Sequence, residues 1–101
     1  MKCWVTMGYF DDRGDGRIVE LDASDGSSRC VVAFDPPERF SVPGKGFTGA
    51  AWMDGDGRGD LLVCGSAAVF RFDARSLDHV GTLSQPSFND VHGVAVYGDR
   101  L

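Results

Sequence analysis

The chain has 101 residues, of which 43% are hydrophobic and 25% are charged, a balance typical of one globular domain rather than of a disordered chain. Ten Lys and Arg residues against 15 Asp and Glu give a net charge of −5, which argues against nucleic acid or an anionic membrane as the partner. No apolar run approaches the ~18 residues of a membrane span, and the first residues do not have a signal peptide's pattern. We therefore expect a soluble, cytoplasmic protein.

Three cysteines, Cys3, Cys30 and Cys64, lie far apart without a Cys-x-x-Cys pair or a nearby histidine. This spacing excludes a zinc site. Each cysteine lies within an apolar run, so we expect reduced thiols that pack as small core residues.

Glycines, prolines and Asp-Gly pairs divide the chain into short apolar segments, which predicts an all-β protein. In the first part of the chain, strands are predicted at residues 3–10, 17–22 and 29–34, joined by turns rich in Gly, Asp and Ser. They form a three-stranded antiparallel meander. The prolines and glycines of residues 36–46 then interrupt the sheet, since proline removes the donors that a central strand needs.

A complete four-stranded meander is predicted after this loop. Its strands are residues 47–53, 61–65, 67–73 and 78–83. One more strand, residues 91–97, begins a hairpin without a second arm. Large aromatic side chains are expected to form the core between the sheets. They are Trp4, Phe10, Phe34, Phe47, Trp52, Phe70 and Phe72.

Two short matches indicate an internal repeat. Leu21-Asp22-Ala23 returns as Phe72-Asp73-Ala74 after 51 residues, and Gly49-Ala50-Ala51-Trp52 returns as Gly93-Val94-Ala95-Val96 after 44 residues. A period of ~40–50 residues with four strands per unit is the sequence signature of β-propeller blades. Chance similarity between short strands is the alternative explanation.

The segment from Val91 to Leu101 resembles the innermost strand and first turn of a blade in the NHL, gluconolactonase and strictosidine-synthase-like group of six-bladed propellers. The resemblance covers the whole chain in the rhythm of its strands. It implies about two blades, whereas a closed propeller needs typically four to eight. Residues 1–35 would supply the three outer strands of one blade, residues 46–84 a complete blade, and residues 91–101 the start of the next.

Both ends of this chain would therefore lie within a blade. The last strand needs a neighbour and the first meander needs an inner strand, so the two could pair between chains. Three copies, a homotrimer, would close six blades and leave no exposed sheet edge. A piece of a longer propeller would show the same pattern.

Residues 54–60 resemble the calcium loop of FG-GAP propeller repeats, in which alternate carboxylates converge on one hard cation. The resemblance maps Asp54, Asp56 and Asp60 onto ligand positions, but it places Trp52 where the first carboxylate belongs. It therefore implies a possible calcium site. A plain Asp-Gly hairpin explains the same residues.

Asn89, Asp90 and His92 lie at the entry to the last predicted strand. In a propeller this position lines the central channel, so these side chains are candidates for a small-molecule site. In the resembled lactonases, carboxylate and amide groups around the axis hold a divalent ion. The alternative is that Asn89 and Asp90 satisfy turn backbone groups and that His92 hydrogen-bonds at a strand start.

The sequence contains no nucleophile elbow, P-loop or dinucleotide fingerprint. It therefore predicts a scaffold or binding module that requires no cofactor. The competing hypothesis is a calcium-dependent hydrolase of lactonase or esterase type, in which the metal polarises an ester carbonyl and His92 or a carboxylate moves the proton. This hypothesis rests on the resemblance alone.

Overall fold

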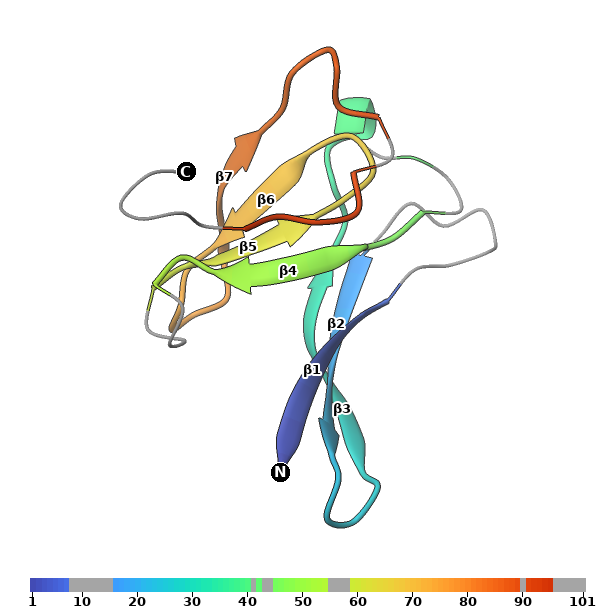
Figure 1. The fold of residues 1–101 in the computed structure, drawn as a ribbon, viewed down its shortest axis with the longest axis vertical. Coiled ribbons are helices and arrows are strands. Elements are labelled where there is room, and N and C mark those ends of the chain that lie inside the picture. The colour runs from blue at the N-terminus through green and yellow to red at the C-terminus, as the bar shows by residue number, and fades with distance from the viewer. Residues whose placement is uncertain (8–15, 41, 43–44, 55–58, 90, 96–101) are drawn as a thin grey trace.

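The computed structural model of the chain describes residues 1–7, 16–40, 42, 45–54, 59–89 and 91–95. Within these ranges the protein has two antiparallel β-sheets, one of three strands and one of four (Figure 1). One 3-10 turn, η1 (Glu38–Phe40), lies between the sheets in the sequence. The predicted all-β class, with a three-stranded meander followed by a four-stranded one, is confirmed.

The first sheet contains β1 (Lys2–Met7), β2 (Gly16–Asp22) and β3 (Ser28–Phe34) in that order. Its strands are rich in β-branched and aromatic residues, which favour the extended backbone. A register shift at Ile18 and Val19 marks a bulge in the pairing of β2 with β3.

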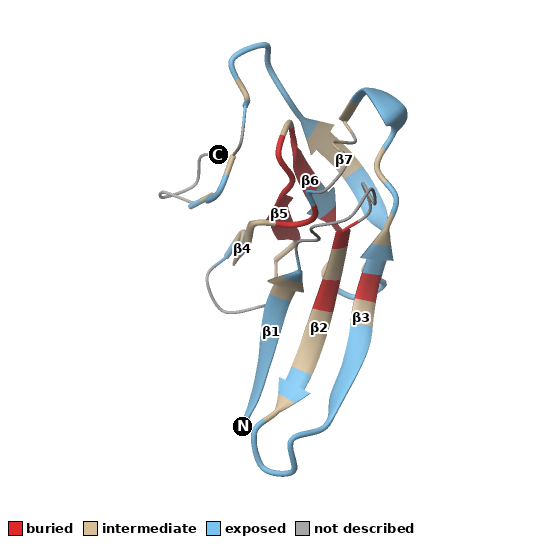
Figure 2. Ribbon diagram, turned by 90° about the vertical axis from the view of Figure 1, so that its right-hand side faces the viewer, coloured by how far each residue is buried: buried red, intermediate tan, exposed pale blue. Residues whose placement is uncertain are grey.

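The second sheet contains β4 (Gly49–Trp52), β5 (Leu61–Cys64), β6 (Val69–Phe72) and β7 (His79–Leu83), again in sequence order. Every residue of β5 is buried, whereas β1 is exposed over nearly its whole length (Figure 2). A strand without polar residues, such as Leu-Leu-Val-Cys, is typical of a position covered on both faces.

One face of the second sheet packs against the first sheet and forms the larger core. Phe34 of β3 contacts the rings of Phe70 and Phe72 at centroid distances of 4.9 and 5.3 Å. Ile18 and Val32 of the first sheet are buried in the same cluster. The predicted aromatic core between the sheets is confirmed for Phe34, Phe47, Phe70 and Phe72.

The opposite face of the second sheet carries a smaller core, made of Leu62, Cys64 and Val69. The segment after β7 covers it, through side chains that include Phe88, Val91 and Val94. The second sheet is therefore covered on both faces, by the first sheet on one side and by Phe88, Val91 and Val94 on the other.

Four expectations from the sequence need correction or lie outside the described residues. Trp4 is 37% exposed rather than buried. Cys3 and Cys30 are exposed and only Cys64 is buried. Residues 91–95, predicted as the start of a strand, form none in the described part of the chain. Phe10 lies outside the described residues.

Candidate functional site

Two of the three predicted channel residues, Asn89 and His92, lie along the segment that covers the smaller core. Asn89 and His92 are both exposed, and Asp90 lies outside the described residues. The backbone beside them is fixed at Val91, whose N–H donates to the carbonyl of Ser66 at 3.1 Å and whose carbonyl accepts from the Thr48 hydroxyl at 2.5 Å. The segment therefore holds two exposed polar side chains on a backbone that is attached to the second sheet.

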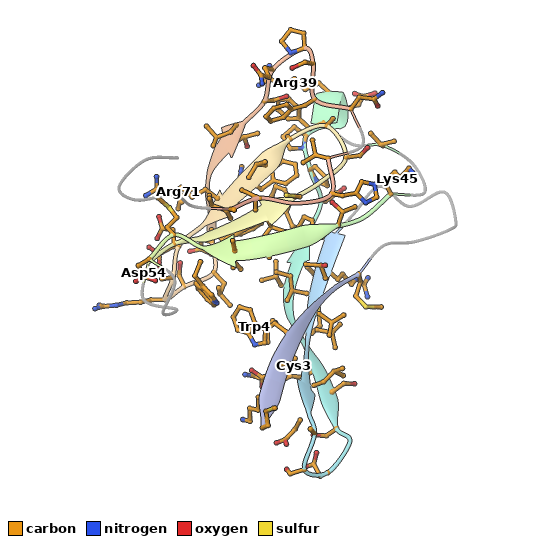
Figure 3. The ribbon with its side chains drawn as sticks, viewed as in Figure 1. Cys3, Trp4, Arg39, Lys45, Asp54 and Arg71 are labelled. Atoms are coloured by element: carbon orange, nitrogen blue, oxygen red, sulfur yellow. The ribbon has the colours of Figure 1, made fainter. Side chains whose placement is uncertain are left out.

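Asp60, the last predicted ligand of the calcium loop, accepts hydrogen bonds from protein groups through both carboxylate oxygens. Arg71 Nε donates to Asp60 Oδ2 at 2.6 Å, and the Ala74 N–H donates to Asp60 Oδ1 at 3.3 Å. Asp54 is exposed, and Asp56 lies outside the described residues. In the described ranges, no group of three or more His, Cys, Asp or Glu residues is placed to hold a metal ion. Figure 3 shows Asp54 and Arg71 at the same end of the second sheet.

Two aspartates 51 residues apart organise matching turns, which sequence analysis detected only as a three-residue repeat. In the first turn the Asp22 N–H donates to the Ser27 carbonyl at 2.9 Å, and in the second the Asp73 N–H donates to the Asp78 carbonyl at 2.9 Å. Hydrogen bonds from Ser24 lower the pKa of Asp22, and hydrogen bonds from Ser76 and Arg75 lower that of Asp73. The repeat of Leu21-Asp22-Ala23 as Phe72-Asp73-Ala74 in the sequence therefore corresponds to two turns with the same hydrogen bonds.

A polar cluster that sequence reasoning missed is centred on Glu20 of β2 and includes residues of β1 and β3. Trp4 Nε1 donates to Glu20 Oε2 at 2.9 Å, and Arg29 Nε donates to Glu20 Oε1 at 3.0 Å. Lys2 Nζ lies 3.9 Å from the same carboxylate. These contacts, with the Trp4 hydrogen bond foremost, lower the pKa of Glu20. Because the partners are 9 to 18 residues away in sequence, only the strand register brings them together.

A groove of about 350 Å³ separates β1 from β4. Trp4 and Trp52 form one of its walls, with ring centroids 5.4 Å apart and planes inclined by 46°. Figure 3 shows Trp4 projecting from β1 toward the second sheet. The other lining residues are Lys2, Thr6, Ile18, Ala50, Ala51 and Leu61. This volume is at the lower end of the range for small-ligand sites.

The face of the first sheet that points away from the second sheet is mainly apolar, with Arg17 at one end and Ser28 at the other, and it is partly exposed; we call it the open face. Cross-strand pairing places its members on one side of the sheet, since paired residues share a face. Val5, Met7 and Leu21 are 37–38% exposed there. Its other apolar members are Cys3, Val19, Cys30 and Ala33. Contiguous exposed apolar patches of this kind mark interaction surfaces.

Comparison with known proteins gave no further guidance: no family model, curated protein or solved structure matches this chain. Within the described residues, no helix has the length and apolar character needed to cross a membrane.

Proposed function

We propose that this chain is a repeat-built scaffold of propeller type, completed by self-association into a ring of three copies. The observation that carries the proposal is the contrast between the two sheets. The second sheet is covered on both faces, whereas Val5, Met7 and Leu21 on the open face of the first sheet are 37–38% exposed. A second copy of the chain would cover this face with apolar surface.

The exposed area supports this proposal. The chain exposes 6564 Å², whereas a compact folded monomer of this mass exposes about 5600 Å². In a ring each chain has two interfaces, each burying ~800 Å² per partner, so self-association would more than remove this excess of about 1000 Å².

The matching turns support a repeated blade-like unit. β2 and β3 are joined by the turn at Asp22, and β6 and β7 by the equivalent turn at Asp73. Each chain would contribute two units, so three chains would give six, within the usual four to eight. In such a ring the exposed Asn89 and His92 would recur around the axis and provide the place for a small-molecule ligand. Asp90 belongs to the same proposed site.

Light scattering on a sizing column tests the proposal. We expect a mass near three times the 10.9 kDa of one chain. A mass of two or four chains would contradict the count of six units. A folded monomer throughout the micromolar range would contradict self-association itself and would favour the alternative that such units follow one another along a longer chain.

A further inference from the structure

We propose that the junction between copies is an antiparallel strand pair, in which residues 91–95 of one copy join the free edge of β1 of the next. This inference rests on the proposed self-association and names the residues that carry it. Four observations support it. They are the position of residues 91–95 on the second sheet, the edge of β1 that is unpaired among the described residues, the strand register that the β4–β5 pair predicts for the junction, and the space around Gly93.

Val91 is attached to the second sheet by a hydrogen bond similar to the one that attaches Phe47 to the first sheet, although its acceptor lies one residue beyond the counterpart of Met7. The Phe47 N–H donates to the carbonyl of Met7, the last residue of β1, at 3.0 Å. Its counterpart 44 residues later, Val91, donates its N–H to the carbonyl of Ser66, two residues beyond β5, at 3.1 Å. Phe47 is buried in the larger core, and Val91 packs on the smaller one. Residues 91–95 thus occupy the position of a first strand.

In the described part of the chain, the first sheet has no strand at the place where residues 91–95 would add one. The turns at Asp22 and Asp73 are equivalent, so β2 and β3 of the first sheet correspond to β6 and β7 of the second. Because β1 pairs with β2 and β5 pairs with β6, β1 corresponds to β5. In the second sheet, β4 pairs with β5. Among the described residues, β1 pairs only with β2, so its other edge is available. Residues 91–95 of one copy could therefore serve as the strand that pairs with β1 in the first sheet of the next copy.

The register follows from the β4–β5 pair. Cys3 pairs with Leu21 and Leu61 pairs with Phe72, so Cys3 corresponds to Leu61 and Val5 to Val63. Because Ala50 pairs with Val63, its counterpart Val94 would lie opposite Val5 of the next copy. Val94 already packs on the smaller core. The open face, to which Val5 belongs, would then cover this core.

Two equivalent glycines give the steric signature of the junction. A Cβ at Gly49 would lie 2.7 Å from the carbonyl oxygen of His92, so the chain passes too close for any side chain. A Cβ at the counterpart, Gly93, would meet no heavy atom within 4 Å among the described residues. Thr48 is the counterpart of His92, 44 residues earlier in the sequence. In the proposed ring, Thr48 of the next copy therefore lies against Gly93 as His92 lies against Gly49 within one chain. Gly93 is therefore free within one chain but covered in the ring.

The first test is Gly93→Ala, compared with Gly81→Ala. The nearest atom to a Cβ at Gly81 is Arg71 Cβ at 3.9 Å, so this control adds a methyl group without a clash. We expect Gly93→Ala to weaken self-association by at least about tenfold, equal to about 1.4 kcal/mol, with an unchanged far-ultraviolet circular dichroism spectrum. Gly81→Ala should keep the wild-type mass. An oligomer that survives Gly93→Ala undiminished would overturn the junction.

The second test is a disulfide between copies in a background carrying Cys3→Ser and Cys30→Ser. Val5→Cys and Val94→Cys are prepared as separate chains, mixed and oxidised. Opposed residues of an antiparallel pair have Cβ atoms ~4.5–5.5 Å apart, so a covalent heterodimer should form rapidly. The control pairs Val94→Cys with Val80→Cys, another exposed valine. If wild type is oligomeric but the two pairs cross-link equally, the junction is wrong; if wild type is monomeric, the self-association proposal fails first.

Discussion

Gly26 and Leu77, 51 residues apart, have the same left-handed backbone conformation, with φ of 73° and 60°. Each closes its turn by donating its N–H to the carbonyl of the turn's aspartate, at 2.8 Å from Gly26 to Asp22 and 2.9 Å from Leu77 to Asp73. This conformation is costly for a residue with a Cβ. Leu77 adopts it nonetheless and packs against the larger core, whereas Gly26 is exposed.

Gly26→Ala should therefore destabilise the protein by a backbone effect alone. A Cβ at Gly26 meets nothing within 4 Å among the described residues, so the cost is that of placing alanine in the left-handed region, about 1 kcal/mol. Urea denaturation measures it as a lower midpoint. Gly81→Ala is the control, because its φ is not left-handed. Equal midpoints for wild type and Gly26→Ala would show that the turn relaxes to another conformation.

Acid should weaken the protein through Asp22 and Asp73. Both carboxylates have a pKa that is lowered in the folded state by turn hydrogen bonds. Their stabilising contribution is therefore complete above the unfolded pKa, near 3.9, and is lost as the pH falls through the lower folded pKa. We expect unfolding midpoints in urea to fall between about pH 5 and pH 2.

The double variant Asp22→Asn and Asp73→Asn keeps an acceptor oxygen in each turn but cannot titrate. Its midpoint should depend less steeply on pH than that of wild type over the same range. Asp78→Asn, in the same turn as Asp73, provides the matched control. Parallel pH profiles for wild type and the double variant would assign the acid sensitivity to other groups.

The seven strands of the described residues and the matching turns at Asp22 and Asp73 could be predicted from sequence because their signals are local. Short apolar runs separated by Gly, Asp and Ser set the strand positions, and Asp22 and Asp73 revealed the matching turns. The exposure of Cys3 and Cys30 could not be predicted in this way. Alternation shows which residues share a face, but it does not show whether another layer covers that face.

The candidate site was harder to predict for a related reason. Asp60 looked like a metal ligand in a run of Asp and Gly, but its partner is Arg71 on the neighbouring strand, 11 residues later. Likewise, Glu20 gathers Trp4 and Arg29 from strands on either side. Such contacts depend on strand register, which a short motif does not specify.

Because Asp60 is held by Arg71, millimolar calcium should leave the melting temperature of the wild type unchanged. A cation would have to displace the guanidinium contact at 2.6 Å. Arg71→Ala should lower the free energy of unfolding by up to about 1 kcal/mol, since the pair is partly exposed. Thermal melts with and without calcium, with magnesium as control, measure both effects. A rise in the wild-type melting temperature specific to calcium would restore the metal hypothesis for Asp54, Asp56 and Asp60.

Phe70 should be the residue on which the union of the two sheets most depends. It is fully buried, and its ring lies 4.9 Å from that of Phe34 and 6.3 Å from that of Phe47. Phe70→Ala should cost about 3–5 kcal/mol, which is comparable with the whole stability of a small domain. Val80→Ala, at a 54% exposed position of β7, should change the unfolding midpoint little.

The two tryptophans allow each sheet to be followed separately, since Trp4 belongs to the first and Trp52 to the second. Single-tryptophan variants, Trp52→Phe and Trp4→Phe, should unfold at the same urea concentration because the larger core joins both sheets into one cooperative unit. In the Phe70→Ala background the two fluorescence transitions should separate, with Trp4 changing first, because the buried residues of the first sheet, Ile18 and Val32, lie in the same cluster as Phe70. Coincident transitions in that background would mean that the remaining aromatic contacts suffice to hold the sheets together.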